Sequence, residues 1–192
     1  AIADLAGADL SMRAMLEQLH SIVGTLMYAR NLFMALHDPD ADTLEFIYFV
    51  DDATTDLPVL GVPIPMADMH QSLTWHLVRG GQTLRGSMQA LAQQMDGNLK
   101  ALGAYAQDWL GVPLRDGAQV RGVLVVQSYD QPERYGPEDQ ELLEFVASHV
   151  LTALQRKQAR QDLERAVTLG TAELARTNQA LQAEVARRQK GE

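Results

Sequence analysis

A hairpin from Trp109 to Asp130, WLGVPLRDGAQVRGVLVVQSYD, constrains the fold of this chain more than any other stretch. Asp116 and Gly117 lie between two apolar runs. A short loop that contains a glycine, free to adopt a positive φ, favours antiparallel pairing of the flanking strands. The stretch therefore predicts two adjacent antiparallel strands.

The length of the loop decides which residues of the two strands face each other. A three-residue loop, Asp116 to Ala118, would place Leu114 opposite Val120. In that register one face of the sheet carries Leu110, Val112, Leu114, Val120, Leu124 and Val126, and the other carries Trp109, Val123 and Val125.

The second strand is apolar on both faces, because residues 123–126 follow one another without a polar side chain. Successive side chains of a strand point to opposite faces, so neither face of this strand can lie against water. We expect a layered domain with a helical layer as one cover of the sheet, and a pocket is a candidate for the other side.

The net charge is distributed unevenly along the chain. The 192 residues carry a formal charge of −9, with −12 on residues 1–154 and +3 on residues 155–192. An acidic globular part argues against nucleic acid as a partner, because phosphate binding needs clustered cations. The mildly basic tail is typical of a solvated helix face and not of a membrane anchor.

The chain contains no cysteine, which excludes disulfides, thiolate metal sites, cysteine nucleophiles and chromophores attached at a cysteine. No apolar run approaches the ~20 residues that cross a bilayer, and the N-terminus lacks the pattern of a signal peptide. We expect a soluble, cytoplasmic domain without membrane contact.

Turn residues and apolar spacing divide the rest of residues 1–154 into elements. We expect a packing helix over 9–29, a hairpin of strands 31–37 and 44–50, a loop over 51–69 with a short strand at 62–64, a helix capped by Ser72 and ended by Gly80 and Gly81, a short strand at 83–85, and a partly helical segment over 87–104.

The turn between residues 37 and 44 has the D-x-D-x-D spacing that opens a calcium loop. A calcium loop also needs a following glycine and a bidentate glutamate at its twelfth position. Thr43 and Phe49 occupy those places here. We interpret Asp38, Asp40 and Asp42 as ordinary turn residues and predict no metal site.

A long helix begins at Pro137, with acidic residues in its first turn, where the helix dipole favours anions. Its apolar stripe ends at Leu154, and residues 155–162 hold no large apolar side chain. We therefore place a boundary there, between a globular domain over residues 1–154 and a helical linker over residues 155–192.

Apolar residues return in the linker at spacings typical of a two-stranded coiled coil. The predicted seam consists of Leu163, Val167, Leu174 and Leu181. Gly170, Thr177 and Glu184 occupy the intervening inner positions, and a glycine within a helix costs about 1 kcal/mol relative to alanine. The seam is therefore weak, and a frayed chain end is the alternative.

Several of these stretches resemble bacterial GAF domains. The likeness is strongest in NLFMALHDPDADTLEFIYFVD, WLGVPL, GVLVVQSYD and YGPEDQELLEFVASHV, and it covers roughly residues 10–155. The resemblance implies an α+β fold: a central antiparallel sheet of five or six strands between terminal helices and a layer of loops and short helices that closes a small-molecule pocket. It also implies homodimers formed through the terminal helices.

The linker sequence TAELARTNQALQAEVARRQ resembles the signalling helix that joins such sensors to output domains. Residues 1–154 are then a sensory domain and residues 155–192 a signalling helix. The output domains of such proteins are GGDEF diguanylate cyclases, EAL phosphodiesterases or histidine kinases. The family's marks for specific ligands are missing, so the resemblance does not identify the ligand.

No motif in the sequence indicates catalysis or a cofactor. The five histidines include no pair at helical metal-binding spacing, and we find no Ser-His-acid order and no phosphate-binding loop. His149 lies in a run like a kinase phosphoacceptor box, but Val150 replaces the acidic neighbour of that box. An enzyme is not expected, and no cofactor is predicted.

Two functions remain. The first is a regulatory input module that senses a small molecule or a partner and passes its state along the C-terminal helix to an output domain. The second is a ligand-free dimerisation scaffold. For the first, aromatic residues near the variable loops are candidate ligand contacts. These are Tyr48, Trp75, Tyr105 and Trp109.

Overall fold

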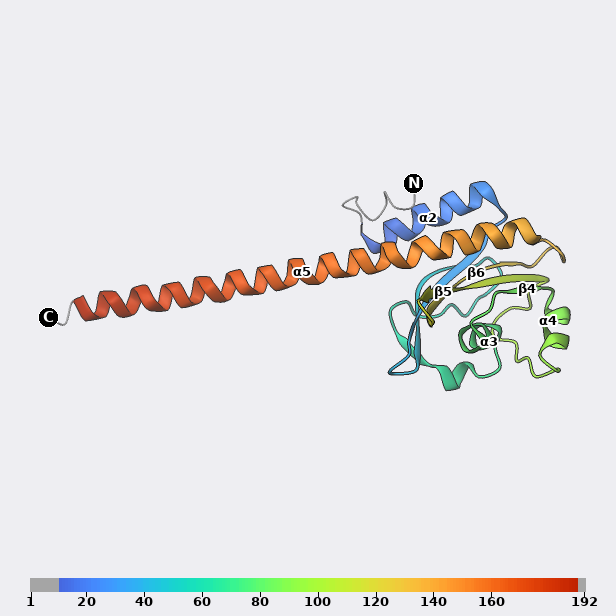
Figure 1. Ribbon diagram of the computed structural model, residues 1–192, viewed down its shortest axis with the longest axis horizontal. Helices are drawn as coiled ribbons and strands as arrows, with labels where there is room; N and C mark the ends of the chain where they lie inside the picture. The colour runs from blue at the N-terminus through green and yellow to red at the C-terminus, as the bar shows by residue number, and fades with distance from the viewer. Residues whose placement is uncertain (1–10, 190–192) are drawn as a thin grey trace. The chain divides into compact units, whose positions relative to one another are not determined.

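The structure, a computed structural model, describes residues 11–189 (Figure 1). The chain separates between Ala153 and Leu154 into two compact units. In chain order the elements are α2 (Met12–Leu26), β1 (Asn31–Asp38), β2 (Thr43–Val50), β3 (Pro63–Pro65), the 3-10 helix η1 (Met66–Met69), α3 (Leu73–Gly80), β4 (Leu84–Gly86), α4 (Met88–Gln94), β5 (Asp108–Asp116), β6 (Gln119–Ser128) and α5 (Pro137–Gln189).

The described residues form one sheet of six strands in the order β3-β2-β1-β6-β5-β4. Every neighbouring pair is antiparallel. The predicted α+β fold with a central antiparallel sheet of five or six strands and a long C-terminal helix is confirmed. The two predicted short strands are β3 and β4, each displaced by one residue.

The predicted register of the central hairpin is wrong along both strands, although every predicted face assignment except that of Val120 holds. Asp116 pairs with Gln119, so the loop holds two residues, and Gly117 adopts a φ of 59°. Arg115 pairs with Val120 and Leu114 with Gly122, so an extra residue bulges from β6. The bulge moves Val120 to the opposite face from the one predicted, where it packs beside Gly81.

Both faces of the sheet are covered, as the apolar run in β6 predicted. In Figure 1, α2 and the beginning of α5 lie over one face and α3 and α4 lie on the other side. Val123, Leu124, Val125 and Val126 are all completely buried. Trp109, Val123 and Val125 share the α3 side with Phe33 and Phe46, in the arrangement predicted for the first three.

Serine caps define the starts of three helices. Ser11, Ser72 and Ser87 each accept a backbone N–H from the third residue beyond, at 3.1–3.2 Å. Gly81 ends α3 with a left-handed φ of 61°. The predicted cap and end of α3 are therefore confirmed. The helix predicted over 9–29 is α2, which ends at Leu26; residues 9 and 10 lie outside the described residues.

The second unit consists of the later part of α5. From Leu163 to Gln189 every described side chain is exposed except Glu184, which is half-buried and pairs with Arg187 and Arg188 of the same helix. The four residues of the predicted seam, Leu163, Val167, Leu174 and Leu181, are 58–65% exposed. The helix passes through Gly170 without interruption.

Candidate functional site

A cavity of about 380 Å³ lies on the α3 side of the sheet. Its walls come from the strands β1, β2, β3, β5 and β6, from η1 and from the starts of α3 and α4. Two loops complete the walls, with residues 54, 56–58, 100–104 and 106. The volume falls in the range of small-molecule sites in proteins. It is lined by Phe33, Phe46, Phe49, Thr54, Asp56, Leu57, Pro58, Ile64, Asp68, Met69, Ser72, Leu73, Thr74, Met88, Lys100, Ala101, Leu102, Gly103, Ala104, Ala106, Trp109, Gln127 and Tyr129.

Three phenylalanines form an aromatic wall of the cavity. Phe33 stacks on Phe49, with ring centroids 5.5 Å apart and an interplanar angle of 16°. Phe46 contacts both rings at centroid distances of 5.5 and 5.7 Å. Such contacts fix the rings relative to one another and leave a rigid apolar surface.

A β-bulge places two of these rings on the same face. Phe46 and Phe49 are three residues apart and would lie on opposite faces of a regular strand. Met34 pairs with Tyr48 but Ala35 pairs with Phe46, so Ile47 is an extra residue in β2. The bulge turns Phe49 toward the cavity.

Trp109 supplies a fourth aromatic side chain. Its ring lies against Gly111, so closely that a Cβ on Gly111 would come within 2.3 Å of the indole. The glycine therefore leaves the space that the ring occupies. Trp109 is only 4% exposed and lines the cavity.

A hydrogen-bonded carboxylate organises the polar wall. Asp51 Oδ2 accepts the Tyr129 hydroxyl at 2.6 Å and also the side-chain amide of Gln127. Its Oδ1 accepts the backbone N–H groups of Ala53 at 2.9 Å and Thr54 at 2.7 Å. Both oxygens of Asp51 are therefore satisfied, and the network fixes the orientation of Gln127 and Tyr129.

The network also changes the ionisation of its members. Burial alone would raise the pKa of Asp51, but the hydrogen bonds from Tyr129, Thr54, Ala53 and Gln127 outweigh burial and lower it below 3.8. Burial, with the hydrogen bond to Asp51 as second cause, raises the pKa of Tyr129 well above 10.0. Asp51 is therefore ionised and Tyr129 protonated at neutral pH.

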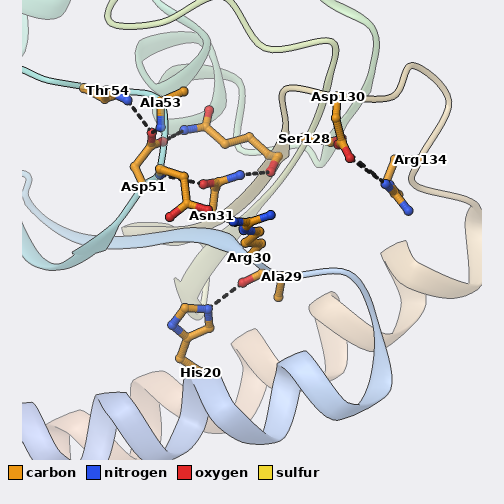
Figure 2. A network of polar contacts seen from close by, with 12 residues as sticks. His20, Ala29, Arg30, Asn31, Asp51, Ala53, Thr54, Ser128, Asp130 and Arg134 are labelled. Atoms are coloured by element: carbon orange, nitrogen blue, oxygen red, sulfur yellow. Dashed lines mark hydrogen bonds and ion pairs between the residues drawn. The ribbon is translucent and has the colours of Figure 1, made fainter.

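Asn31 connects this wall to three strands at the same end of the sheet (Figure 2). Its side-chain amide donates to the carbonyl oxygen of Gln127 at 3.2 Å, and its Oδ1 accepts the backbone N–H of Asp52 at 2.9 Å. Asn31 is 2% exposed. It therefore ties the start of β1 to the ends of β2 and β6.

The structure places the four candidate ligand residues in four different surroundings. Trp109 lines the cavity. Tyr48 lies under α2, where its hydroxyl bonds to Nδ1 of His20 at 2.8 Å. The other ring nitrogen of His20 contacts the carbonyl oxygen of Ala29 and so must carry the proton, which makes the Tyr48 hydroxyl the donor to Nδ1.

Trp75 and Tyr105 lie outside the cavity wall. Trp75 is on α3, in edge-to-face contact with His70 and His76 at 4.8 and 5.0 Å. Tyr105 is 60% exposed and lines a neighbouring hollow beside Leu99. The structure thus brings one of the four candidates into the cavity and does not bring the four together.

Sequence reasoning missed most of the polar wall. Gln127 and Tyr129 lie in the quoted run VVQSYD, where a polar residue interrupts a buried strand. A buried glutamine in such a position requires partners, and that requirement was the available signal. The partner, Asp51, is distant in sequence and lies in a loop without a recognisable motif.

The histidines and acids form no metal centre in the described part of the chain, where no group of three or more metal-binding side chains comes together. In the predicted acidic turn, Asp38 accepts the backbone N–H groups of Asp40 and Ala41, and Asp42 pairs with Arg79. Across residues 11–189, no helix is both long and apolar enough to span a bilayer.

Comparisons with known proteins agree with this architecture. A family model described as a GAF domain matches residues 9–155. No curated protein matches the chain. Among solved structures, the GAF domain of an Acinetobacter phosphoenolpyruvate-protein phosphotransferase is similar, with 17% identity and a TM-score of 0.62, covering 82% of this chain and 90% of that one.

Two further solved structures show the same fold in different settings. The GAF domain of a Bacillus halodurans two-component sensor histidine kinase has 18% identity and a TM-score of 0.58, covering 79% of this chain and 98% of that chain. A Neisseria meningitidis free methionine-R-sulfoxide reductase, solved with its substrate, has 16% identity and a TM-score of 0.61. The match covers 83% of this chain and 87% of that chain.

Proposed function

The chain belongs to the GAF domain family of sensory regulatory modules, and from this premise we propose that it is a signal-input module whose cavity binds a small molecule. The observation that carries the proposal is the cavity itself, which has a rigid aromatic wall and a polar wall fixed by Asp51. A ligand-free scaffold would instead fill this space with side chains, as protein cores do.

The end of β6 supports a route from the cavity toward α5. Gln127 and Tyr129 line the cavity, whereas Ser128 between them donates its hydroxyl to Asp130 at 2.8 Å. Asp130 pairs with Arg134 at 3.3 Å, just before α5 begins (Figure 2). A ligand that displaces Gln127 or Tyr129 therefore moves the segment that leads into α5.

A second contact holds the same segment. The buried carboxylate of Asp108, at the start of β5, accepts the backbone N–H of Tyr135 at 2.9 Å. Asp108 pairs with Ser128 across the sheet. The start of α5 is thus attached to the strand pair that forms part of the cavity. Transmission requires that the ligand bind one arrangement of this segment more tightly than another.

We assign the later part of α5 the role of passing the state to an output domain. Its helix is continuous through residue 189, and Leu163, Val167, Leu174 and Leu181 offer a seam for a second copy of the chain. The proposed assembly is a homodimer. The kinase setting of one similar GAF domain supports a histidine kinase output, and cyclic-di-GMP turnover is the other candidate.

A chimera that places a histidine kinase core after residue 192 tests the proposal. A metabolite library is screened first for thermal stabilisation of the 192-residue chain. Compounds that stabilise it should change kinase activity in the chimera. Ala104→Trp, which fills the cavity from its loop, should abolish both effects, while Ala41→Trp in the β1–β2 turn should leave both intact.

Transmission is tested separately in the same chimera. Deletion of one heptad between Leu163 and Leu181 preserves the seam, whereas deletion of four residues shifts it out of register. We expect the response to survive the first deletion and to disappear in the second. Equal responses in both would contradict transmission by the helix. If no compound of the library binds and the chain nevertheless forms a dimer, the result would favour the ligand-free scaffold.

A further inference from the structure

Three side chains in the cavity wall have hydrogen-bonding groups that no described residue satisfies. These groups are the indole N–H of Trp109, the side-chain oxygen of Gln127 and the hydroxyl of Thr74. The three residues are 4%, 9% and 6% exposed. Buried polar groups are normally paired, so three such groups around one cavity mark positions where a bound molecule can donate or accept a hydrogen bond.

The three groups are open to the cavity and not sealed in the core. The side-chain atoms that are both sealed and unpaired, over the described residues, are His76 Nε2, Asp108 Oδ1, Arg134 Nε and the Tyr135 hydroxyl. The groups on Trp109, Gln127 and Thr74 are not among them. Because their residues are otherwise buried, the cavity gives access to these groups.

Each group is also held in place. The ring of Trp109 lies against Gly111. The amide nitrogen of Gln127 donates to Asp51 and to the Tyr129 hydroxyl, 2.8 Å away, which leaves its oxygen as the free acceptor. Thr74 lies in the first turn of α3, whose N-terminus favours an acceptor. The wall therefore presents two donors and one acceptor in fixed positions.

Charged groups line only the outer part of the cavity. Asp56, Asp68 and Lys100 belong to its wall and are all exposed. The nearby carboxylate of Asp51 already has four donors. A charged ligand group placed against Trp109 and Gln127 would lose its hydration without gaining an ionic partner, which is unfavourable.

We infer that the cavity takes an uncharged, planar aromatic molecule that carries both a hydrogen-bond acceptor and an N–H or O–H donor. The ring packs on Phe33, Phe46 and Phe49. The acceptor, such as a carbonyl oxygen, receives the Trp109 N–H or the Thr74 hydroxyl, and the donor binds the Gln127 oxygen. This inference rests on the proposed sensing function and specifies the ligand class for that site.

Matched probe compounds test the ligand class. The uncharged bicyclic lactam 2-quinolinone has one ring N–H and one carbonyl oxygen. Its N-methyl derivative lacks the donor, and quinoline-2-carboxylate places a charge on a similar ring system. Because a lost hydrogen bond inside a binding site leaves a protein group unpaired, we expect 2-quinolinone to bind about tenfold more tightly than either analogue.

The two tryptophans of the chain provide the readout. In the ¹⁵N-labelled 192-residue chain, 2-quinolinone should shift the indole N–H signal of Trp109 in a saturable way and leave that of Trp75 unchanged. Trp75→Phe identifies the signals and should bind normally. Thr74→Val, read at Trp109, and Trp109→Phe, read by titration calorimetry because it lacks the reporter signal, should each weaken binding by about three- to tenfold. Unfolding curves of both variants exclude loss of the fold.

The outcomes separate this inference from the proposed function. Equal or tighter binding of the carboxylate or of the N-methyl derivative, read at Trp109, would overturn the uncharged donor–acceptor class and leave the sensing function standing. If 2-quinolinone does not shift the Trp109 signal but another compound of the metabolite library does, the proposed ligand class is likewise wrong and the sensing function stands. If no compound shifts the Trp109 signal, both the ligand class and the sensing function are wrong.

Discussion

Gly122 lies where three strands meet, paired with Leu36 of β1 and with Leu114 of β5. A Cβ at this position would come within 2.4 Å of the backbone oxygen of Ala35. Backbone in the middle of a sheet cannot move aside easily. We expect Gly122→Ala to destabilise the domain by about 2–3 kcal/mol through overpacking, measured by chemical denaturation.

Gly136 provides the matched control for this substitution. A Cβ there would meet only the carboxylate of Asp139, at 3.8 Å, which is an ordinary contact. Gly136→Ala should therefore change the free energy of unfolding by less than about 0.5 kcal/mol. Equal losses of stability in the two variants would show that the close approach to the Ala35 backbone is not the reason why Gly122→Ala destabilises the domain.

Asp51 should make stability depend on pH. Its pKa is lowered in the folded state, so its contribution is present above the unfolded-state value near 3.8 and is lost as the pH falls through the folded-state pKa. In Asp51→Asn, the amide nitrogen faces the Tyr129 and Gln127 donors. We expect this variant to be about 1–3 kcal/mol less stable than the parent at pH 7.

The difference in the free energy of unfolding between Asp51→Asn and the parent should shrink as the pH is lowered from 5 toward 3. At low pH the carboxylate of Asp51 takes up a proton, and the parent loses the contribution of the ionised group. Denaturation curves at several pH values measure it. Asp56→Asn, at an exposed position of the cavity wall, should change the free energy of unfolding at pH 7 by less than about 0.5 kcal/mol. A constant difference for Asp51→Asn across the range would contradict the ionised network.

At the residue scale the sequence predicts environment better than it predicts partners. Trp109 was placed on the correct face because alternation within one strand is enough. Phe49 could not be placed, because the bulge at Ile47 depends on how β1 pairs with β2. Gln127 and Asp51 are 76 residues apart, so their contact follows from the whole sheet and not from either local pattern.

Helices and strands were predicted well where the apolar residues followed one regular spacing, and less well where two strands had to be aligned with each other. The hairpins, the cap at Ser72 and the start at Pro137 followed from local chemistry. The central register did not, because a two-residue loop with a bulge and a three-residue loop without one are both compatible with the apolar pattern. Only the bulged register places Val120 beside α3.

Gly170 is the weakest point of α5 at the scale of the element. Nothing lies within 4 Å of the position that its Cβ would occupy. Gly170→Ala should therefore strengthen the helix locally, by about 1 kcal/mol of intrinsic propensity, without steric cost. Amide exchange of the neighbouring residues 166–174 should slow in the variant.

A control distinguishes the propensity effect from a general effect of substitution in this segment. Thr177→Ala, an exposed inner position of the predicted seam, should slow exchange less, because threonine is closer to alanine in helix propensity than glycine is. Unchanged exchange in Gly170→Ala would mean that the local stability of α5 is limited by something other than this glycine.

At the scale of the whole molecule, the division into two units predicts that the first folds without most of the second. Its buried residues span both faces of the sheet and include Leu143, Val146 and Val150 of α5. A chain ending after Asp162 keeps all of these. The described residues among those removed, 163–189, are exposed except for the half-buried Glu184, so their loss uncovers little apolar surface.

We therefore expect the 1–162 chain to keep the unfolding midpoint of the 192-residue chain within about 2 °C, a shift that corresponds to less than about 1 kcal/mol for a domain of this size. Scanning calorimetry should be run on dilute samples, because association of the full chain would add concentration-dependent stability. A chain ending after Gly136 serves as the opposite control: it lacks the whole of α5, leaves one face of the sheet covered by α2 alone and should not fold. If the 1–162 chain also failed to fold, residues 163–192 would be part of the folding unit, and the predicted domain boundary after residue 154 would have to move toward the C-terminus.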